Sequence, residues 1–293
     1  MDGVLNLNKP SGWTSHDVVA KVRGILQEKQ IGHLGTLDPL ATGVLPLAVG
    51  AATRLIEFTS YPKEYVTTCL LGKATDSFDI SGKVLEERST EGLSEARVRE
   101  EVLKLKAVIE QVPPMVSAVK VGGRKLYELA RKGRTVERKA RPITIDEVEL
   151  MVVELPRVTF RVACSAGTYI RSLCQDLGAV LGVGGCMEAL ERTRVGPFCI
   201  ERSLNLDELK KNMEAGDLSG MLLPISSLVA GLPEVVLEGP SLEAFCHGMA
   251  QPQKDLPLGP VRVLNAQGRL CAIGEARPEE LKPHKVFGVE GLL

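Results

Sequence analysis

The chain has 293 residues, of which 25% are charged and 44% hydrophobic, and its formal net charge is −1. This composition is typical of a globular protein with a substantial core, and the length allows one large and one small domain. No apolar run approaches the roughly 20 residues of a membrane span, and the N-terminus lacks a basic-then-apolar signal pattern. We therefore expect a cytoplasmic protein with no membrane contact.

The cysteines and histidines predict neither disulfides nor a metal site. The seven cysteines are an odd number without a Cys-x-x-Cys pair, which argues against a disulfide framework and against a zinc ribbon. The four histidines are scattered, and the adjacent Cys246 and His247 have no second pair of ligands. We therefore expect no metal ion.

The N-terminal part of the chain predicts short strands and amphipathic helices. Residues 3–7 suit a strand, and Ser15 is the predicted N-cap of a helix with Val18, Val22 and Leu26 on its apolar face. The other elements predicted here are a strand at 44–49 and a helix at 51–58.

The middle of the chain predicts a mixed sheet. Val158, Phe160, Val162 and Cys164 alternate with other residues, as is typical of a strand with one buried face. Strands and helices do not alternate as they do in parallel βαβ proteins, so we predict an α+β fold with a mixed, largely antiparallel sheet. The predicted elements are strands at 65–71, 83–86, 116–121, 144–153 and 158–164, and helices at 94–106 and 171–181, the last ending at Gly182.

A change in composition predicts a domain boundary near residue 225. Residues 223–233 are rich in small apolar residues, glycine and proline, which is typical of a linker. Beyond them, residues 260–274 predict a hairpin that turns at 266–268. We therefore expect one domain at 1–225 and a small β-rich module at 226–293.

One segment is strongly basic although the whole chain is nearly neutral. Between Lys120 and Arg141, nine basic residues stand against two glutamates, an excess of +7. A run of charge is usually a solvated surface. The contrast with the rest of the chain favours contact with phosphates instead.

Residues 32–43 are the most informative part of the chain. They place an acid, Asp38, in a loop whose conformation is restricted by Pro39 and permitted by Gly35 and Gly43. Asp-Pro is a common turn opener, so an isolated dipeptide would predict only a turn. A carboxylate held this firmly between two apolar runs indicates chemistry.

The same stretch, Gly-His-Leu-Gly-Thr-Leu-Asp-Pro-Leu-Ala-Thr-Gly, resembles the catalytic-aspartate motif of the TruB family of tRNA pseudouridine synthases. Other segments resemble further motifs of that family, in its order. They are residues 3–15 (Lys-Pro-x-Gly-x-Thr-Ser), 63–65 (the tyrosine motif), 167–171 (Tyr-x-Arg) and 190–194 (Leu-x-Arg). The resemblance covers residues 3–205, with a weaker match to a PUA-like module at the C-terminus.

This resemblance implies a pseudouridine synthase fold and an isomerase that acts on uridine 55 in the T-loop of tRNA. The N1–C1′ bond breaks, the flipped-out base turns in the pocket, and C5 bonds to C1′. No redox step or group transfer occurs, so no cofactor is implied. A carboxylate nucleophile starts the reaction at C1′ or at C6, and the sequence does not distinguish these two atoms. We expect a monomer that binds tRNA without an obligate protein partner.

The resemblance also assigns roles to four catalytic candidates. Asp38 is the nucleophile, and Arg171 pairs with it and favours its ionised form. Tyr65 stacks on the target base. Tyr169 lies beside the sugar and assists proton removal. Because Tyr169 and Arg171 are two residues apart, they share a face only in extended chain, so we expect the helix to begin at or after Arg171.

The remaining candidates are implied to bind the RNA. Leu190 packs against the base, and His33 occupies the space left by the flipped uridine, which offsets a cost of a few kcal/mol. The basic segment, about 116–145, corresponds to a thumb-like insertion that is mobile without RNA and closes over it. The other predicted contacts are Lys9, Arg192, Lys120, Arg124 and Lys125.

Other functions remain open at this point. A tRNA-binding chaperone without modification activity would use the same basic segment and C-terminal module, but it would not need Asp38, Tyr65, Tyr169 and Arg171. A guide-RNA-dependent pseudouridylase is an alternative within the superfamily, although its long basic extensions are absent. An aspartate-dependent hydrolase is less favoured, because no second catalytic carboxylate or metal cluster stands out.

Overall fold

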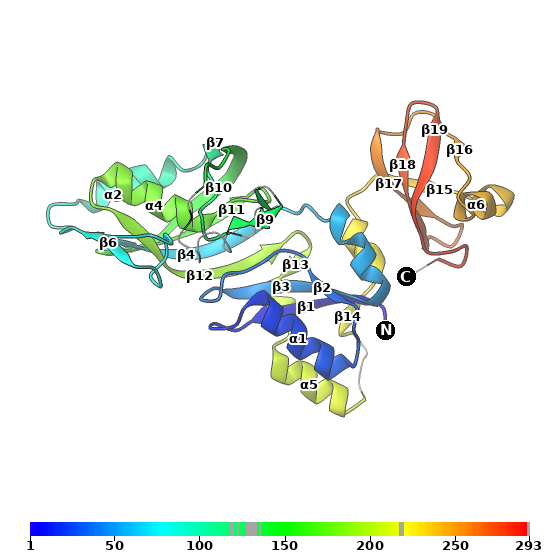
Figure 1. The fold of residues 1–293 in the computed structure, drawn as a ribbon, viewed down its shortest axis with the longest axis horizontal. Coiled ribbons are helices and arrows are strands. Elements are labelled where there is room, and N and C mark those ends of the chain that lie inside the picture. The colour runs from blue at the N-terminus through cyan, green and yellow to red at the C-terminus, as the bar shows by residue number, and fades with distance from the viewer. Residues whose placement is uncertain (118–119, 122, 127–133, 135, 217–219, 292–293) are drawn as a thin grey trace.

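The computed structural model describes residues 1–117, 120–121, 123–126, 134, 136–216 and 220–291 (Figure 1). In this part of the chain the largest sheet has ten strands, with the path β14-β1-β3-β12-β4-β11-β10-β7 and with β13 and β2 paired to β12 and β3. Every pairing in it is antiparallel except that of β12 with β3. The predicted mixed, largely antiparallel sheet is therefore confirmed.

The strands of the large sheet come from most of the length of the chain. They are β1 (Gly3–Lys9), β2 (Ile31–His33), β3 (Thr42–Val49), β4 (Lys63–Leu71), β7 (Val108–Gln111), β10 (Arg141–Glu154), β11 (Arg157–Cys164), β12 (Gly185–Val195), β13 (Phe198–Cys199) and β14 (Leu222–Leu223).

The central strands of this sheet are held by one buried face. Val158, Phe160, Val162 and Cys164 on β11 are all 0% exposed, which confirms the predicted alternation. Burying an aliphatic or aromatic side chain contributes about 1.5–3 kcal/mol. Helices that pack against this face complete the core, which positions the strands that carry the site.

Several helices differ from the predictions at their ends or in their type. Thr14, not Ser15, is the N-cap of the first helix, because Thr14 and Asp17 form a reciprocal capping box. Residues 50–58 form a 3₁₀ helix, and the helix predicted at 94–106 ends at Leu103. The helices are α1 (Ser15–Leu26), α2 (Glu95–Leu103), α4 (Ile170–Leu181), α5 (Leu206–Glu214), α6 (Gly239–Cys246), η1 (Gly50–Phe58), η2 (Ile200–Arg202) and η3 (Ile225–Val229).

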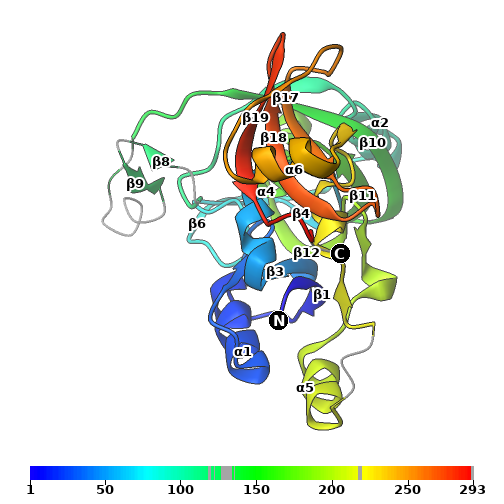
Figure 2. The same cartoon turned by 90° about the vertical axis from the view of Figure 1, so that its right-hand side faces the viewer.

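The basic segment contains a small hairpin rather than the single strand predicted at 116–121. Strands β8 (Lys120–Val121) and β9 (Arg124–Lys125) pair with each other, and Figure 2 shows them projecting away from the large sheet. Residues 115–117 form a bend. The predicted mobility of this segment concerns mainly positions 118–119, 122, 127–133 and 135, which lie outside the described residues.

A second, five-stranded sheet lies near the C-terminus, with the order β15-β17-β18-β19-β16. It contains the predicted hairpin, formed by β17 and β18. No helix in the described residues is long and apolar enough to cross a membrane. The strands are β15 (Glu234–Val236), β16 (Gln251–Pro252), β17 (Gly259–Leu264), β18 (Leu270–Ala276) and β19 (Glu280–Val286), and a separate pair consists of β5 (Lys73–Thr75) and β6 (Val84–Glu87).

The connection between the two sheets is packed against both of them. Ile225 and Leu228 of η3 are 2% and 1% exposed, and they share a core with Val44 of β3 and Ile273 of β18. The composition of residues 223–233 predicts a linker because it is rich in glycine and proline, but its apolar residues are used as core. The small β-rich module is thus seated on the domain that carries the site (Figure 1).

Candidate active site

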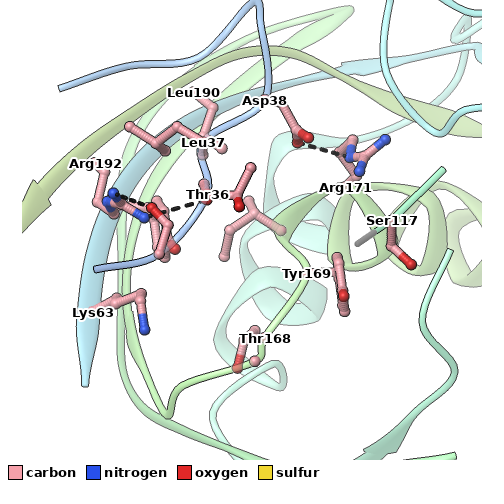
Figure 3. A pocket seen from close by; sticks show the side chains of 14 residues that line it. Thr36, Leu37, Asp38, Lys63, Ser117, Thr168, Tyr169, Arg171, Leu190 and Arg192 are labelled. Atoms are coloured by element: carbon pink, nitrogen blue, oxygen red, sulfur yellow. Dashed lines mark hydrogen bonds and ion pairs between the residues drawn. The ribbon is translucent and has the colours of Figure 1, made fainter. Parts of the chain in front are cut away.

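A pocket of about 270 Å³ opens between the loop before β3, strands β4 and β12, and the start of α4 (Figure 3). All four predicted catalytic residues line it. Leu190 and Arg192, predicted to bind RNA, line it as well. The full lining is Gly35, Thr36, Leu37, Asp38, Lys63, Tyr65, Ser117, Gly167, Thr168, Tyr169, Ile170, Arg171, Leu190 and Arg192.

Asp38 and Arg171 form an ion pair at one side of this pocket. Arg171 Nε lies 3.0 Å from Asp38 Oδ2, and the side chains are 4% and 32% exposed. Burial raises the pKa of Asp38, and the charge of Asp79 adds to this effect, although Arg171 opposes it. The arginine therefore limits, but does not reverse, the effect of burial. The result is a partly accessible carboxylate that is more basic than an exposed one.

Asp79 is a second acid at this site, and its local sequence does not predict this role. Its Oδ2 lies 3.4 Å from Arg171 Nη1, and Asp79 is 4% exposed. Ser77 Oγ donates to Asp79 Oδ1 at 2.8 Å, which fixes the carboxylate in the turn before β6. In the sequence, Asp79 belongs to an Asp-Ile-Ser-Gly stretch, which indicates only a turn. No local signal shows that this acid faces an arginine 92 residues away.

Arg171 also connects the site to the start of the basic segment. Its Nη2 donates to the carbonyl oxygen of Val116 at 2.7 Å, and its Nη1 donates to that of Ser77 at 3.2 Å. The guanidinium thus contacts three separate segments through a planar set of donors. Ser117, next to Val116, lines the pocket, and its buried hydroxyl has no partner among the described residues.

The loop of residues 32–43, called here the Asp38 loop, is fixed by hydrogen bonds from two buried cations to backbone carbonyl oxygens. Lys9 Nζ donates to the carbonyl oxygens of Pro10, Trp13 and Pro39 at 2.9, 2.6 and 3.2 Å. Burial lowers the pKa of Lys9 to about 8. Because Lys9 is 0% exposed and lies outside the pocket, this geometry does not support the predicted contact with substrate.

Arg192 is the second of these cations, and it fixes the other end of the loop. Its Nε donates to the carbonyl oxygen of Val44 at 2.8 Å, and its Nη2 donates to that of Gly35 at 3.0 Å. A Cβ at Gly43 would lie 2.3 Å from the carbonyl oxygen of Arg192. Gly43 also has a φ of +101°, so both the conformation and the close approach require glycine there.

Ser15 links helix α1 to the same loop. Its hydroxyl accepts a hydrogen bond from Leu37 N at 2.9 Å and lies 3.2 Å from the Leu37 carbonyl oxygen, to which it donates. Ser15 is 2% exposed. The residue predicted as a helix cap therefore positions the backbone directly before Asp38.

The strand residues Tyr65 and Leu190 form an apolar wall of the pocket. They lie on the paired strands β4 and β12 and are 6% and 7% exposed. Burial raises the pKa of Tyr65 to about 12, so its hydroxyl is protonated at neutral pH. A planar ring beside an aliphatic side chain suits a flat, uncharged ligand.

Tyr169 is fixed at the N-cap of α4 by a side chain from β7. Gln111 Oε1 accepts from Tyr169 N at 2.7 Å, and Gln111 Nε2 donates to the Tyr169 carbonyl oxygen at 3.1 Å. Tyr169 is extended, with φ −102° and ψ 105°, as expected. The helix begins at Ile170, one residue before the predicted start, because only Tyr169 needs to be extended for both side chains to line the pocket.

His33 lies at the end of β2 and is not among the pocket-lining residues. Its Nδ1 accepts from Gly35 N at 3.3 Å, and its ring centroid lies 6.1 Å from that of His16 in an edge-on arrangement. The structure therefore places His33 on the Asp38 loop. Among the predicted contacts of the basic segment, Lys120, Arg124 and Lys125 are described only as members of the β8–β9 hairpin.

A family model for the TruB family pseudouridylate synthase N-terminal domain matches residues 23–170. The chain belongs to the TruB family. A second model, for the tRNA pseudouridylate synthase B C-terminal domain, matches residues 171–230. The resemblance seen in the sequence is thereby confirmed, and the chain is a pseudouridine synthase, an isomerase.

Two curated members of the TruB family match nearly the whole chain. The tRNA pseudouridine synthase B of Heliobacterium mobile is 45% identical, over 94% of this chain and 90% of that protein. Its counterpart in Thermobifida fusca is 43% identical, over 98% of both chains. Among solved structures, that of a Cbf5-Nop10-Gar1 complex matches 97% of this chain and 84% of the other, with 31% identity and a TM-score of 0.76.

Proposed function

We propose that this chain converts uridine 55 in the T-loop of tRNA to pseudouridine, with Asp38 as the nucleophile. One observation carries the proposal: a partly accessible, arginine-paired carboxylate lies in a pocket lined by Tyr65 and Leu190. The curated relatives are named tRNA pseudouridine synthase B, and the choice of uridine 55 comes from the resemblance of the motifs.

The reaction needs one nucleophile and two proton movements. Asp38 adds to C1′ or to C6, the N1–C1′ bond breaks, and the base turns in its pocket. C5 then bonds to C1′, the proton on C5 leaves, N1 gains a proton, and the Asp38 carboxylate is released. The raised pKa of Asp38 favours this chemistry, because a more basic carboxylate is a better nucleophile once ionised.

The pocket walls suit the proposed base. We assign Tyr65 to stacking on the uracil, Leu190 to packing against the base, and Tyr169 to the sugar and the transfer of the C5 proton. A uracil that is held in this pocket must leave its stack in the RNA. We propose that His33, on the Asp38 loop, occupies the space in the RNA stack that the flipped uridine leaves.

The basic segment, the C-terminal module and the oligomeric state are also matters of proposal. The basic segment at about 116–145 is proposed to bind tRNA phosphates through Lys120, Arg124 and Lys125, and the module at 226–293 is proposed to be PUA-like. We propose a stand-alone cytoplasmic monomer rather than a guide-RNA-dependent enzyme. The curated relatives at 43–45% identity support this choice over the 31% identity to the Cbf5 complex.

Tritium release tests this proposal directly. A tRNA transcript that carries tritium at C5 of uridine should release label equivalent to one uridine with the wild type. We expect no release with Asp38→Asn, because an amide is not a nucleophile here. Asp146→Asn is the matched control, since Asp146 is exposed on β10. Tight tRNA binding without release by the wild type would contradict the proposal and favour the chaperone alternative.

A further inference from the structure

A lysine lines the pocket at the side remote from Asp38. Lys63 is the first residue of β4 and stands two residues before Tyr65, so both side chains point to the same face of the strand. Figure 3 shows Lys63 and Asp38 on different sides of the pocket. Lys63 belongs to the tyrosine motif in the sequence, but nothing described above uses its charge.

The ammonium group of Lys63 has unused donors. It donates to the carbonyl oxygen of Tyr61 at 3.1 Å, and no carboxylate of the described residues lies within 4.0 Å of it. An ammonium has three hydrogens, so two remain for a ligand. Burial lowers the pKa of Lys63 to about 8, and the nearby Arg192 adds to this effect. Such an unpaired cation is costly unless it meets an anionic group.

Arg192, the neighbouring cation, is already satisfied. It donates to the carbonyl oxygens of Val44, Gly35 and Thr36. The backbone of Gly35 lies beside both cations, since a Cβ there would be 3.5 Å from Lys63 Cε and 3.6 Å from Arg192 Nη1. Of the two, Lys63 is therefore the one with donors to offer to a substrate.

The proposed reaction places a particular atom near Lys63. If Asp38 acts at C1′ or at C6, the N1 side of the uracil lies near Asp38. C4 is opposite N1 in the ring, so O4 points away from Asp38. When the base turns about the axis through N3 and C6, N1 exchanges places with C5, and C4 exchanges places with C2. A group that contacts O4 before this turn contacts O2 after it.

We propose that Lys63 donates a hydrogen bond to the carbonyl oxygen opposite the glycosidic bond, which is O4 in the substrate and O2 in the product. This inference rests on the function proposed above. A uracil anion that has left C1′, and a C6 adduct, both carry negative charge on the carbonyl oxygens. A fixed ammonium stabilises that charge without reorganisation. Lys63 would therefore hold the base through its rotation while Asp38 acts at the other side.

Substitution of both partners of this hydrogen bond tests the inference. Lys63→Met keeps the length of the side chain and removes its charge. The matched control is Lys73→Met, which removes a lysine outside the pocket that pairs with Glu87. Each protein is assayed with a T-arm stem-loop RNA that carries uridine or 4-thiouridine at the target, because sulfur accepts a hydrogen bond more weakly. The measurements are the RNA Kd and the single-turnover rate at saturating enzyme.

We expect Lys63→Met to lower the single-turnover rate on uridine by about 10²-fold, as for loss of one preorganised donor. We expect its Kd to change by less than about threefold and its rate on 4-thiouridine to fall by about tenfold or less. A weaker Kd with an unchanged rate would overturn the inference and assign Lys63 to a phosphate. An unchanged rate and Kd, or an equal loss with both bases, would also overturn it.

Two controls keep the outcomes distinct. If Lys63→Met shows no cooperative unfolding, Lys63→Gln replaces it and the same two ratios decide. The proposed function fails only if the wild type and Lys73→Met form no pseudouridine on the uridine RNA. A fully active Lys63→Met beside an active wild type would contradict this inference alone.

Discussion

The buried cations around the Asp38 loop have two different kinds of partner. At the pocket, Arg171 meets the carboxylates of Asp38 and Asp79. Lys9 instead donates to three backbone carbonyl oxygens, and Arg192 donates to three others and also interacts with the side chain of Tyr65. The first arrangement pairs directly with a reactive group, whereas the second fixes a backbone shape and has a smaller effect on the pKa of Asp38. A buried basic residue near an active site is therefore not in itself evidence of contact with substrate.

Loss of the carboxylate-paired cation should have the largest effect. Arg171→Met removes the cation that most opposes the rise in the pKa of Asp38 and leaves the charge of Asp79 beside it, so the pKa of Asp38 rises further. We expect the single-turnover rate on the T-arm RNA to fall about 10³-fold. Arg157→Met is the control, because Arg157 pairs with Glu188 at the surface. If Arg171→Met kept more than about a tenth of the wild-type rate, the charge of Arg171 would not be essential.

A side chain at Gly43 should disturb the backbone of the Asp38 loop without changing any charge. Gly43→Ala combines a positive φ with a Cβ placed 2.3 Å from the carbonyl oxygen of Arg192. We expect it to lower the free energy of unfolding by about 3 kcal/mol in urea denaturation. Gly12→Ala, with φ +81° and nothing within 4 Å of the added Cβ, should cost about 1 kcal/mol. Equal losses would mean that the contact with Arg192 contributes nothing.

Replacement of Lys9 should show the smallest effect and sharpen the comparison. Lys9→Met leaves three carbonyl oxygens without their donor. We expect a loss of about 2 kcal/mol in the free energy of unfolding, with an RNA Kd within about twofold of the wild type. The exposed Lys29→Met is the control for loss of one charge. A tenfold weaker Kd at unchanged stability would restore the predicted contact of Lys9 with substrate.

Local patterns predicted the elements better than the contacts between them. The alternation in β11, the hairpin of β17 and β18, and the end of α4 at Gly182 follow from period-two burial and turn chemistry. The 3₁₀ form of residues 50–58 and the packing of η3 depend on neighbours far away in the sequence. Composition alone cannot distinguish a flexible linker from an apolar connection that joins two sheets.

In the site, too, local motifs predict individual residues better than they predict contacts between distant residues. Motif resemblance brought Asp38, Tyr65, Tyr169, Arg171 and Leu190 to one pocket, and the structure lines the pocket with all five. It did not reveal Asp79 or Ser117, because their importance lies in contacts across the fold rather than in their local sequence. It also did not predict that Lys9 is buried beneath the loop.

The parallel pairing of β12 with β3 has a consequence for how the active site comes into existence. Arg192 on β12 pairs with Gly43 on β3, so this strand pairing joins two parts of the site that are far apart in the sequence. Such long-range pairings form slowly, because the chain loses the entropy of the intervening loop before the new contacts stabilise the pairing. A chain emerging from the ribosome carries no complete pocket until Arg192 has been released. Catalytic competence is therefore expected late in folding, after β1 and β3 have paired and β12 has joined them in the sheet.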